Sequence, residues 1–342
     1  MIWILLACAG SKNVDSAAET EAYHWSADWS ALTDGVTAVN SGESLPSSYT
    51  VFGDRAFPVI WDEDYRPFVV ATSVGDGRAV FFGHEGMTGG LANQDDGYNR
   101  LLRNAVQWSA SGEDRALTVG LLGDYADAAA ILEGEGHTVQ AAELSDLDED
   151  VLIMSAYESR DTLTRERLEE YIREGGGLLV TGHAWWWAYS NPDLNVVESY
   201  ESGWMAELMG VSWTPYSHVN AWEDTVSAEP PSDLQHAERA LDAFKAHFEG
   251  QRSLSLAEQN VGLATLDLAI GTLPLSFSEF FNDARSYSEQ VGPIVPTLEA
   301  PLVPAEQPAQ ALSARLEAKF ALEDAPERVL AHPAAEELWG PF

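Results

Sequence analysis

The chain has 342 residues, and its hydrophobic content of 45% is typical of a globular protein with a substantial core. Its 55 acidic and 18 basic residues give a formal net charge of −37, which repels nucleic-acid phosphates and anionic lipid headgroups. We therefore expect no nucleic-acid partner. The single cysteine, Cys8, excludes disulfides within the chain and Cys-x-x-Cys metal sites.

The N-terminus reads MIWILLACAGSK, an apolar run that leads directly into Cys8 and is followed by a polar stretch without periodicity. This pattern resembles a bacterial lipoprotein signal, in which the residues before the cysteine are removed and Cys8 is lipidated. It predicts a signal and flexible tether over residues 1–22, and a lipid-anchored protein on the periplasmic or outer-membrane surface of the bacterial cell envelope. The alternative is an irregular apolar N-terminus that is not a lipoprotein signal.

Two apolar segments after the tether are typical of a β-hairpin. Residues 68–74 and 78–83 flank Asp76-Gly77, which is a strong turn signal. Residues 98–110 then have apolar positions at helical spacing.

The pattern next alternates between strand and helix. The expected strands are 117–122, 138–141, 151–154 and 177–181, with helices at 126–133 and 164–174. Such alternation favours a parallel sheet with right-handed crossovers, which binds ligands at the carboxyl ends of its strands. We therefore predict an α/β domain over residues 23–228.

The composition changes near residue 229. Apolar positions then indicate helices near 234–248, 255–270, 276–290 and 309–322. Residues 292–308 are rich in proline and form neither a helix nor a central strand, so they are predicted to be a linker. We expect residues 229–342 to form an α-helical C-terminal region.

Four stretches point to a known family. They are LPSSYTVFGDRAFPVI, GDGRAVFFGHEGM, LLRNAVQW and GGGLLVTGHAWWWA. In this order and spacing they resemble the N-terminal region of the TRP-channel-associated factor (TCAF) family and its bacterial relatives, over about residues 35–215. The resemblance implies a class I glutamine amidotransferase-like fold, with a flavodoxin-like, mostly parallel sheet flanked by helices. It also implies an enhancin-like zinc metallopeptidase domain, active on glycoproteins, in full-length members.

The sequence departs from both chemistries that the resemblance implies. An enhancin-like peptidase needs His-Glu-x-x-His on a helix, and Thr88 stands where His84-Glu85 would require the second histidine. We therefore expect the peptidase domain to be absent from this chain. At the glutaminase elbow, GLLVTGHAW places His183 where the nucleophilic cysteine would stand. We expect no glutaminase activity, no bound metal and no cofactor.

The order of the elements suggests a permuted domain. Residues 23–112 resemble the closing half of an amidotransferase-like domain, and residues 115–228 resemble its opening half. If both halves contribute strands to one sheet, His84 and His183 face one another at its carboxyl edge although they are 99 positions apart. If the halves form separate domains, the two histidines lie far apart.

Six residues form the candidate binding cleft: His84, Glu85, His183, Trp185, Trp186 and Trp187. Consecutive helical residues point about 100° apart, so the three tryptophans cannot all enter one core. An exposed indole is a typical platform for a sugar ring, whereas the alternative is packing under a loop. His183 alternatively caps the following helix. The adjacent pair His84 and Glu85 reaches one pocket only if the strand ends in a turn.

Three functions remain open. We favour a non-catalytic, surface-tethered domain that recognises a glycan or glycoprotein as an accessory to an enhancin-like peptidase partner. The second is a thiol-independent hydrolase that uses His84, Glu85 and His183. The third is a scaffold whose tryptophans are purely structural, and solvent access to those rings distinguishes it from the first two.

Overall fold

The computed structural model describes most of the chain between residues 23 and 324. The described ranges are 23–42, 44–112, 115–159, 161–217, 225–291 and 308–324. Cys8 and the predicted linker up to residue 307 lie outside them. Within these ranges, every helix is too short or too polar to cross a lipid bilayer.

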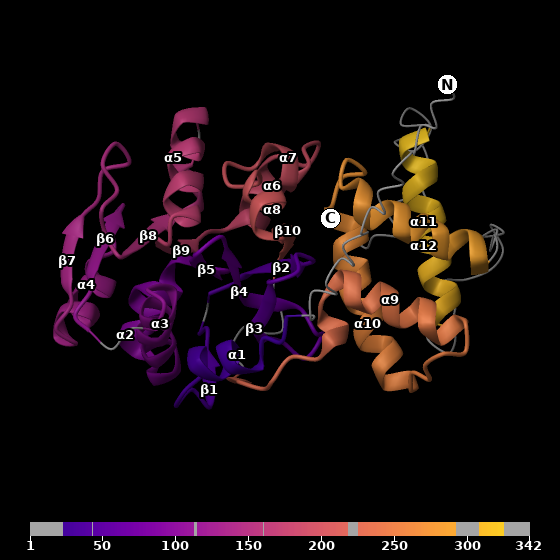
Figure 1. Ribbon diagram of the computed structural model, residues 1–342, viewed down its shortest axis with the longest axis horizontal. Helices are drawn as coiled ribbons and strands as arrows, with labels where there is room; N and C mark the ends of the chain where they lie inside the picture. Colours follow the sequence, from indigo (N-terminus) through magenta and orange to yellow (C-terminus); the bar gives the residue numbers. More distant parts are fainter. Residues whose placement is uncertain are drawn as a thin grey trace, which may run out of the picture.

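A seven-stranded sheet lies at the centre of the N-terminal two thirds of the chain (Figure 1). In spatial order its strands are β3 (Phe57–Trp61), β4 (Pro67–Val74), β5 (Gly77–Phe82), β9 (Gly177–Thr181), β8 (Val151–Ser155), β6 (Thr118–Leu122) and β7 (Thr138–Ala141). The five strands from β5 to β7 pair in parallel, whereas β4 is antiparallel to both neighbours. The predicted α/β class with a mostly parallel sheet is confirmed.

The strand order is that of a flavodoxin-like sheet in a different chain order. Flavodoxin-like sheets have the spatial order 2-1-3-4-5, in which the numbers give the order of the strands along the chain. Strands 1, 2, 3 and 4 of that order correspond here to β6, β7, β8 and β9. The fifth place is taken by β5, which precedes them in the sequence and pairs with β9 from Arg78–Gly177 to Phe82–Thr181. The segments 23–112 and 115–228 therefore contribute strands to one sheet.

Helices cover both faces of this sheet (Figure 1). One face packs against α1 (Ser26–Leu32), α3 (Asp96–Ser109) and α4 (Ala126–Gly134). The other packs against α5 (Thr162–Arg173), α6 (Ala184–Ser190), α7 (Val196–Ser199) and α8 (Met205–Met209). Along β8, Ile153 belongs to the first core and Leu152 to the second, so burial on both sides explains the continuous apolar run of this strand.

Two antiparallel ribbons extend the domain. The first pairs β2 (Ser47–Val51) with β10 (Val211–Ser217), and the second pairs β1 (Ala38–Asn40) with β11 (Thr225–Ser227). Beside the first ribbon, the Gly210 carbonyl accepts the N–H groups of Phe52 and Gly53, both at 2.9 Å. A Cβ on Gly53 would lie 2.5 Å from the Gly210 Cα, so this close approach of two backbones requires glycine.

The C-terminal part of the described chain is helical, as predicted. It comprises α9 (Ala237–Phe248), α10 (Leu256–Thr272), α11 (Ser278–Val291) and α12 (Pro308–Asp324), which enclose a third hydrophobic core. Phe52, Val197 and Ala206 of the α/β domain also belong to this core. His236 joins this region to the α/β domain, because its Nε2 lies 3.0 Å from the Gly53 carbonyl and its ring stacks on Trp25.

Candidate functional site

The candidate site lies where β5 and β9 end at the carboxyl edge of the sheet. After β5 the chain turns into a short 3₁₀ helix, Glu85–Thr88, and after β9 it enters α6. The turn at the end of β5 allows the adjacent residues His84 and Glu85 to reach the same place as His183. Three side chains from two distant segments are thus brought together.

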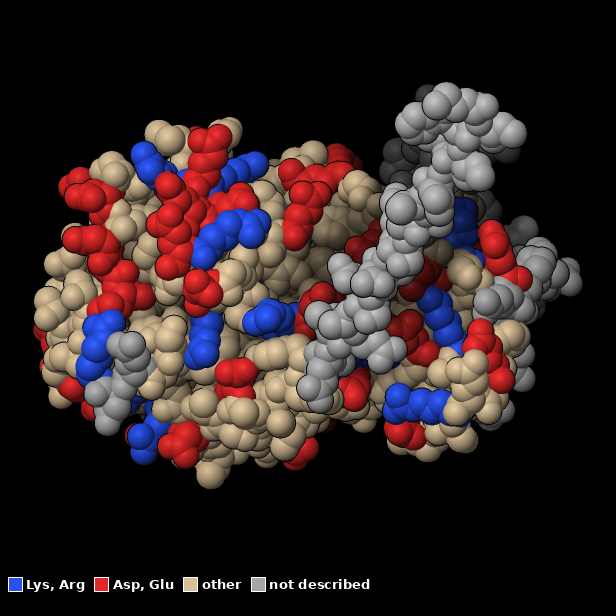
Figure 2. All heavy atoms as spheres, viewed as in Figure 1, with Lys and Arg blue, Asp and Glu red and all other residues tan. Residues whose placement is uncertain are grey.

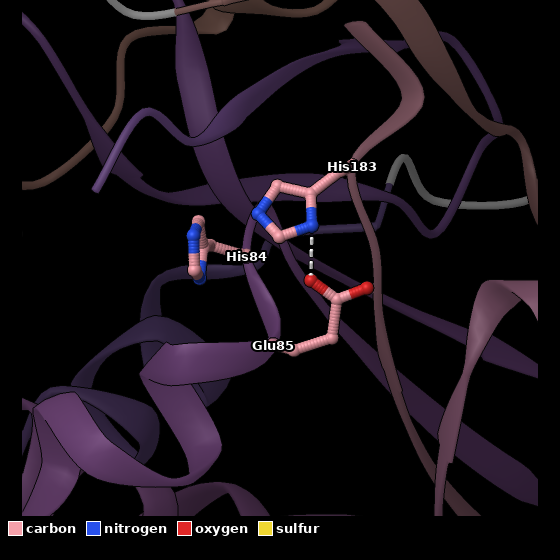
Figure 3. Close-up of side chains that lie close together, drawn as sticks. All are labelled: His84, Glu85 and His183. Carbon is pink, nitrogen blue, oxygen red and sulfur yellow. Dashed lines mark ion pairs between the residues drawn. The ribbon is translucent and has the colours of Figure 1, made fainter. Parts of the chain in front are cut away.

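The two histidines face one another, as the permuted sheet predicts. Their ring centroids are 3.9 Å apart and the ring planes meet at 85°. Nδ1 of His183 pairs with a carboxylate oxygen of Glu85 (Figure 3). On the other side, Nδ1 of His84 accepts the N–H of Gly86 at 2.8 Å. We call His84, Glu85 and His183 the edge cluster.

Burial and pairing determine the charges of His84 and Glu85. Burial and the charge of His183 lower the pKa of His84 to about 4, against an opposing effect of Glu85. Burial alone raises the pKa of Glu85, but the hydrogen bond and the charge of His183 outweigh it and leave that pKa below its usual value. At neutral pH Glu85 is therefore ionised. His84 is neutral with its proton on Nε2, because Nδ1 accepts a backbone N–H.

The residue types of the edge cluster can bind metal ions, so we ask whether their geometry and hydrogen bonds fit a metal centre. One ligand atom from each residue lies within 4.8 Å of the others, and two imidazoles with a carboxylate are zinc ligands in known proteins. However, Nδ1 of His84 already accepts the N–H of Gly86, and Nε2 carries the ring proton. His84 could bind a metal ion only if it lost either that proton or the hydrogen bond from Gly86. These pairings favour a hydrogen-bonded cluster over a metal centre.

His183 is also poorly placed to act as a general base. Its Nδ1 is engaged by Glu85, and Figure 3 shows its edge with the second nitrogen on the side of the His84 ring. A general base must come within hydrogen-bond reach of the proton that it removes. In this arrangement His84 lies on that side of His183, and the ionised Glu85 remains partly exposed.

A pocket of about 450 Å³ opens beside the edge cluster. It lies at the ends of β5, β6 and β8 and is lined by Glu85, Gly86, Gly89, Gly90, Gly123, Asp124, Tyr125, Ala126, Asp127, Ser155 and Glu158. Of the six candidate residues, only Glu85 lines it. Its carboxylates are not balanced by any lysine or arginine among the lining residues, so the pocket has a negative potential.

Two of the three tryptophans are anchored to the protein. Trp185 donates its indole N–H to the Leu45 carbonyl at 2.8 Å. Trp187 packs on the second core, with its ring centroid 5.7 Å from that of the buried Tyr200. Both rings therefore have structural contacts.

Trp186 points outward instead. Its side chain is 55% exposed and its ring stacks on Tyr189, which is 73% exposed, at 5.8 Å and 24°. We call this pair the aromatic platform. His183 precedes the helix that carries it and makes no side-chain cap bond; its backbone carbonyl accepts the N–H of Trp186 and Trp187 instead. His183 therefore occupies the N-cap position of α6, as the alternative interpretation has it, but its side chain pairs with Glu85 instead of capping the helix.

Sequence reasoning missed Tyr189 as a partner of Trp186. The signal was present in WWWAY, because residues three apart on a helix are neighbours on its surface. It also missed the pocket residues Gly123, Asp124 and Ser155, although each stands at or just after the end of a predicted strand.

Comparison with known proteins identifies the family. Residues 11–223 match the family TCAF_N, described as the TRPM8 N-terminal domain. The chain belongs to this family. It is 30% identical to TRPM8 channel-associated factor 2 of Bos taurus over 220 residues, which are 64% of this chain and 23% of the relative. The homolog from Xenopus laevis is 27% identical over 236 residues, covering 69% and 25%. The chain thus spans about a quarter of the length of these relatives.

Among solved structures, the chain resembles the IMPa metallopeptidase from Pseudomonas aeruginosa. The TM-score is 0.51 with 16% sequence identity, over 85% of this chain and 37% of that one. At this identity the likeness concerns the fold alone. The suspected membership of the TCAF family is confirmed, and the fold resembles that of a metallopeptidase structure.

Proposed function

We propose that this TCAF-type chain is a non-catalytic recognition domain that binds a glycan or glycoprotein through the aromatic platform. The observation that carries the proposal is the outward stack of Trp186 and Tyr189, which leaves two large rings 55% and 73% exposed beside the carboxyl edge of the sheet. Most exposed aromatic area in soluble proteins is small and scattered, whereas contiguous apolar surface marks interaction sites.

Sugar rings fit such a surface. The C–H face of a pyranose is apolar and stacks on an indole, while its hydroxyl groups remain available to polar neighbours. Asn191, which follows the platform, donates its side-chain amide to the Trp187 carbonyl at 2.8 Å and fixes the end of the helix. The end of the helix that carries the platform is therefore fixed before a ligand arrives, which lowers the entropic cost of binding.

Recognition is favoured over catalysis by the edge cluster. Glu85 and His84 occupy both sides of His183, and no thiol stands at this elbow. A hydrolase that uses His183 as its base would need its substrate to reach the ring nitrogen on the side of His84.

The proposal includes a cellular setting. A lipid on Cys8 would hold the domain at the bacterial cell envelope, where it would present a glycoprotein to an enhancin-like peptidase as an accessory domain. The lipoprotein-like N-terminus supports this setting.

Binding to an immobilised, desialylated mucin tests the proposal. Trp186→Ala should weaken binding by about tenfold, since the loss of one stacked aromatic contact is worth about 1.4 kcal/mol. The matched control is Phe248→Ala, which removes a ring that is 48% exposed at the end of α9 in the helical region. If neither the natural chain nor the control binds the mucin, or if Trp186→Ala binds as well as both, the proposal is wrong.

A further inference from the structure

The part of the chain that carries the aromatic platform has an unusual charge distribution. No lysine or arginine occurs between Arg173 and Arg239, whereas acidic residues recur throughout this stretch. The stretch includes α6, α7, α8 and β10, which share the platform's face of the sheet with α5. No guanidinium or ammonium group of this segment can pair with an acidic ligand.

Exposed carboxylates lie close to the platform in the sequence. Asp193 is exposed and follows Tyr189 by four residues, and Glu198 is exposed on α7. The intervening turn is fixed to α6, because Leu194 donates its N–H to the Asn191 carbonyl at 3.1 Å. The Asp193 carboxylate is therefore held near the end of the helix that carries the platform.

The wider surroundings have the same sign. The pocket beside the edge cluster is lined by Glu85, Asp124, Asp127 and Glu158 without a basic residue. Figure 2 shows acidic side chains, drawn in red, over much of the visible face, with blue basic side chains among them. On the platform's face of the sheet, α5 carries Arg165, Arg167 and Arg173, of which Arg167 pairs with Glu170 and Arg173 with Glu169. The segment from α6 to β10 itself supplies only carboxylates, so a ligand on the platform meets a negative local potential from that segment.

We infer that the platform selects by charge: it binds neutral glycans, or glycans with amino sugars, and rejects glycans that carry sialic acid, uronic acid or sulfate at the contacted sugar. This inference rests on the proposed glycan-binding function. An acidic sugar needs a charge-assisted hydrogen bond from arginine or lysine to offset the loss of its hydration, and like charges repel it. An ammonium group on a sugar, in contrast, gains a cation–π contact with Trp186.

The test compares one mucin before and after sialidase treatment. At low salt, the sialylated form should bind at least about tenfold more weakly than the desialylated form, and the difference should shrink near 0.5 M salt because screening shortens the reach of charges to a few Å. Equal binding of both forms overturns the charge selection and leaves the proposed function intact. Binding of neither form overturns the proposed function itself.

A charge-reversal pair tests the local origin of the effect. Asp193→Lys should raise affinity for the sialylated mucin by about tenfold and change affinity for the desialylated form by less than about twofold. Glu133→Lys is the matched control, because Glu133 is exposed on α4, against the opposite face of the sheet. If both variants raise binding equally, net charge alone is responsible and the selection does not reside at the platform.

Discussion

Acidification from pH 7.5 to pH 5 is expected to weaken the contact between the helical region and the α/β domain, because His236 is buried there as a neutral ring. Its Nε2 donates to the Gly53 carbonyl at 3.0 Å, and its Nδ1 accepts the N–H of Arg239 at 3.4 Å. A second proton on the ring would be bound to Nδ1. The Nδ1–H group and the N–H of Arg239 would then be two donors that face each other without an acceptor. Burial, reinforced by the nearby Arg239, lowers the pKa of His236 to about 4.

The sign and size of the effect follow from this lowered pKa. The unfolded chain binds the proton with a pKa of 6.5, so it takes up protons before the folded chain does. The contribution of His236 to stability is fully present above pH 6.5 and is lost as the pH falls from 6.5 towards 4. Between pH 7.5 and pH 5 this linkage amounts to about 2 kcal/mol of unfolding free energy.

Urea unfolding at the two pH values, followed by tryptophan fluorescence, measures this difference. His236→Asn keeps a cap acceptor for Arg239, and His236→Gln keeps an amide donor for Gly53, but neither residue titrates in this range. Both variants should lose about 2 kcal/mol less than the natural chain on acidification. An equal loss in all three proteins, or an NMR titration that places the pKa of His236 near 6.5, would refute the reasoning.

Further outcomes are expected elsewhere in the chain. Gly210→Ala should lower the unfolding free energy by about 3 kcal/mol, because its Cβ would lie 2.2 Å from the Gly53 Cα. Gly112→Ala, also at positive φ but in open space, should cost only about 1 kcal/mol of backbone strain in the same urea assay. Cys8→Ala should abolish palmitate labelling and membrane association in a Gram-negative host; unchanged labelling contradicts the lipoprotein signal. The purified chain should release no ammonia from glutamine, and elemental analysis should find less than one zinc ion per chain. Glutaminase turnover, or one tightly held zinc ion, would overturn our interpretation of His183 and its neighbours.

The periodic elements could be predicted closely from sequence. The ranges predicted for β7 and β9 are those observed, since short apolar runs between turn residues leave little choice of boundary. The predicted start of α5 at residue 164 was two residues late, because Asp161 accepts the N–H of Thr164 at 3.0 Å and caps the helix earlier. The missed cap was visible in the sequence.

Non-local pairing was harder to predict. β10 carries Pro215 and several polar residues, so its own pattern does not indicate a strand; it is ordered by β2, which lies about 160 positions earlier. The meeting of His84 and His183 could be predicted because both follow apolar strands and the family resemblance implies a shared sheet. The pairing of Glu85 with His183 could not be predicted, because it depends on the direction in which the turn after β5 points the Glu85 side chain.

The three consecutive tryptophans can now be explained by the geometry of one short helix. The helix α6 has only seven residues, too few to be stable without tertiary contacts. Trp185 fixes one side of it through the hydrogen bond to Leu45, and Trp187 fixes another through its packing on Tyr200. With these two directions set, the intervening side chain must project away from the protein. Trp186 is therefore exposed because its neighbours are anchored. Replacement of Trp185 or Trp187 should disturb ligand binding, because either change would alter the orientation of the Trp186 ring.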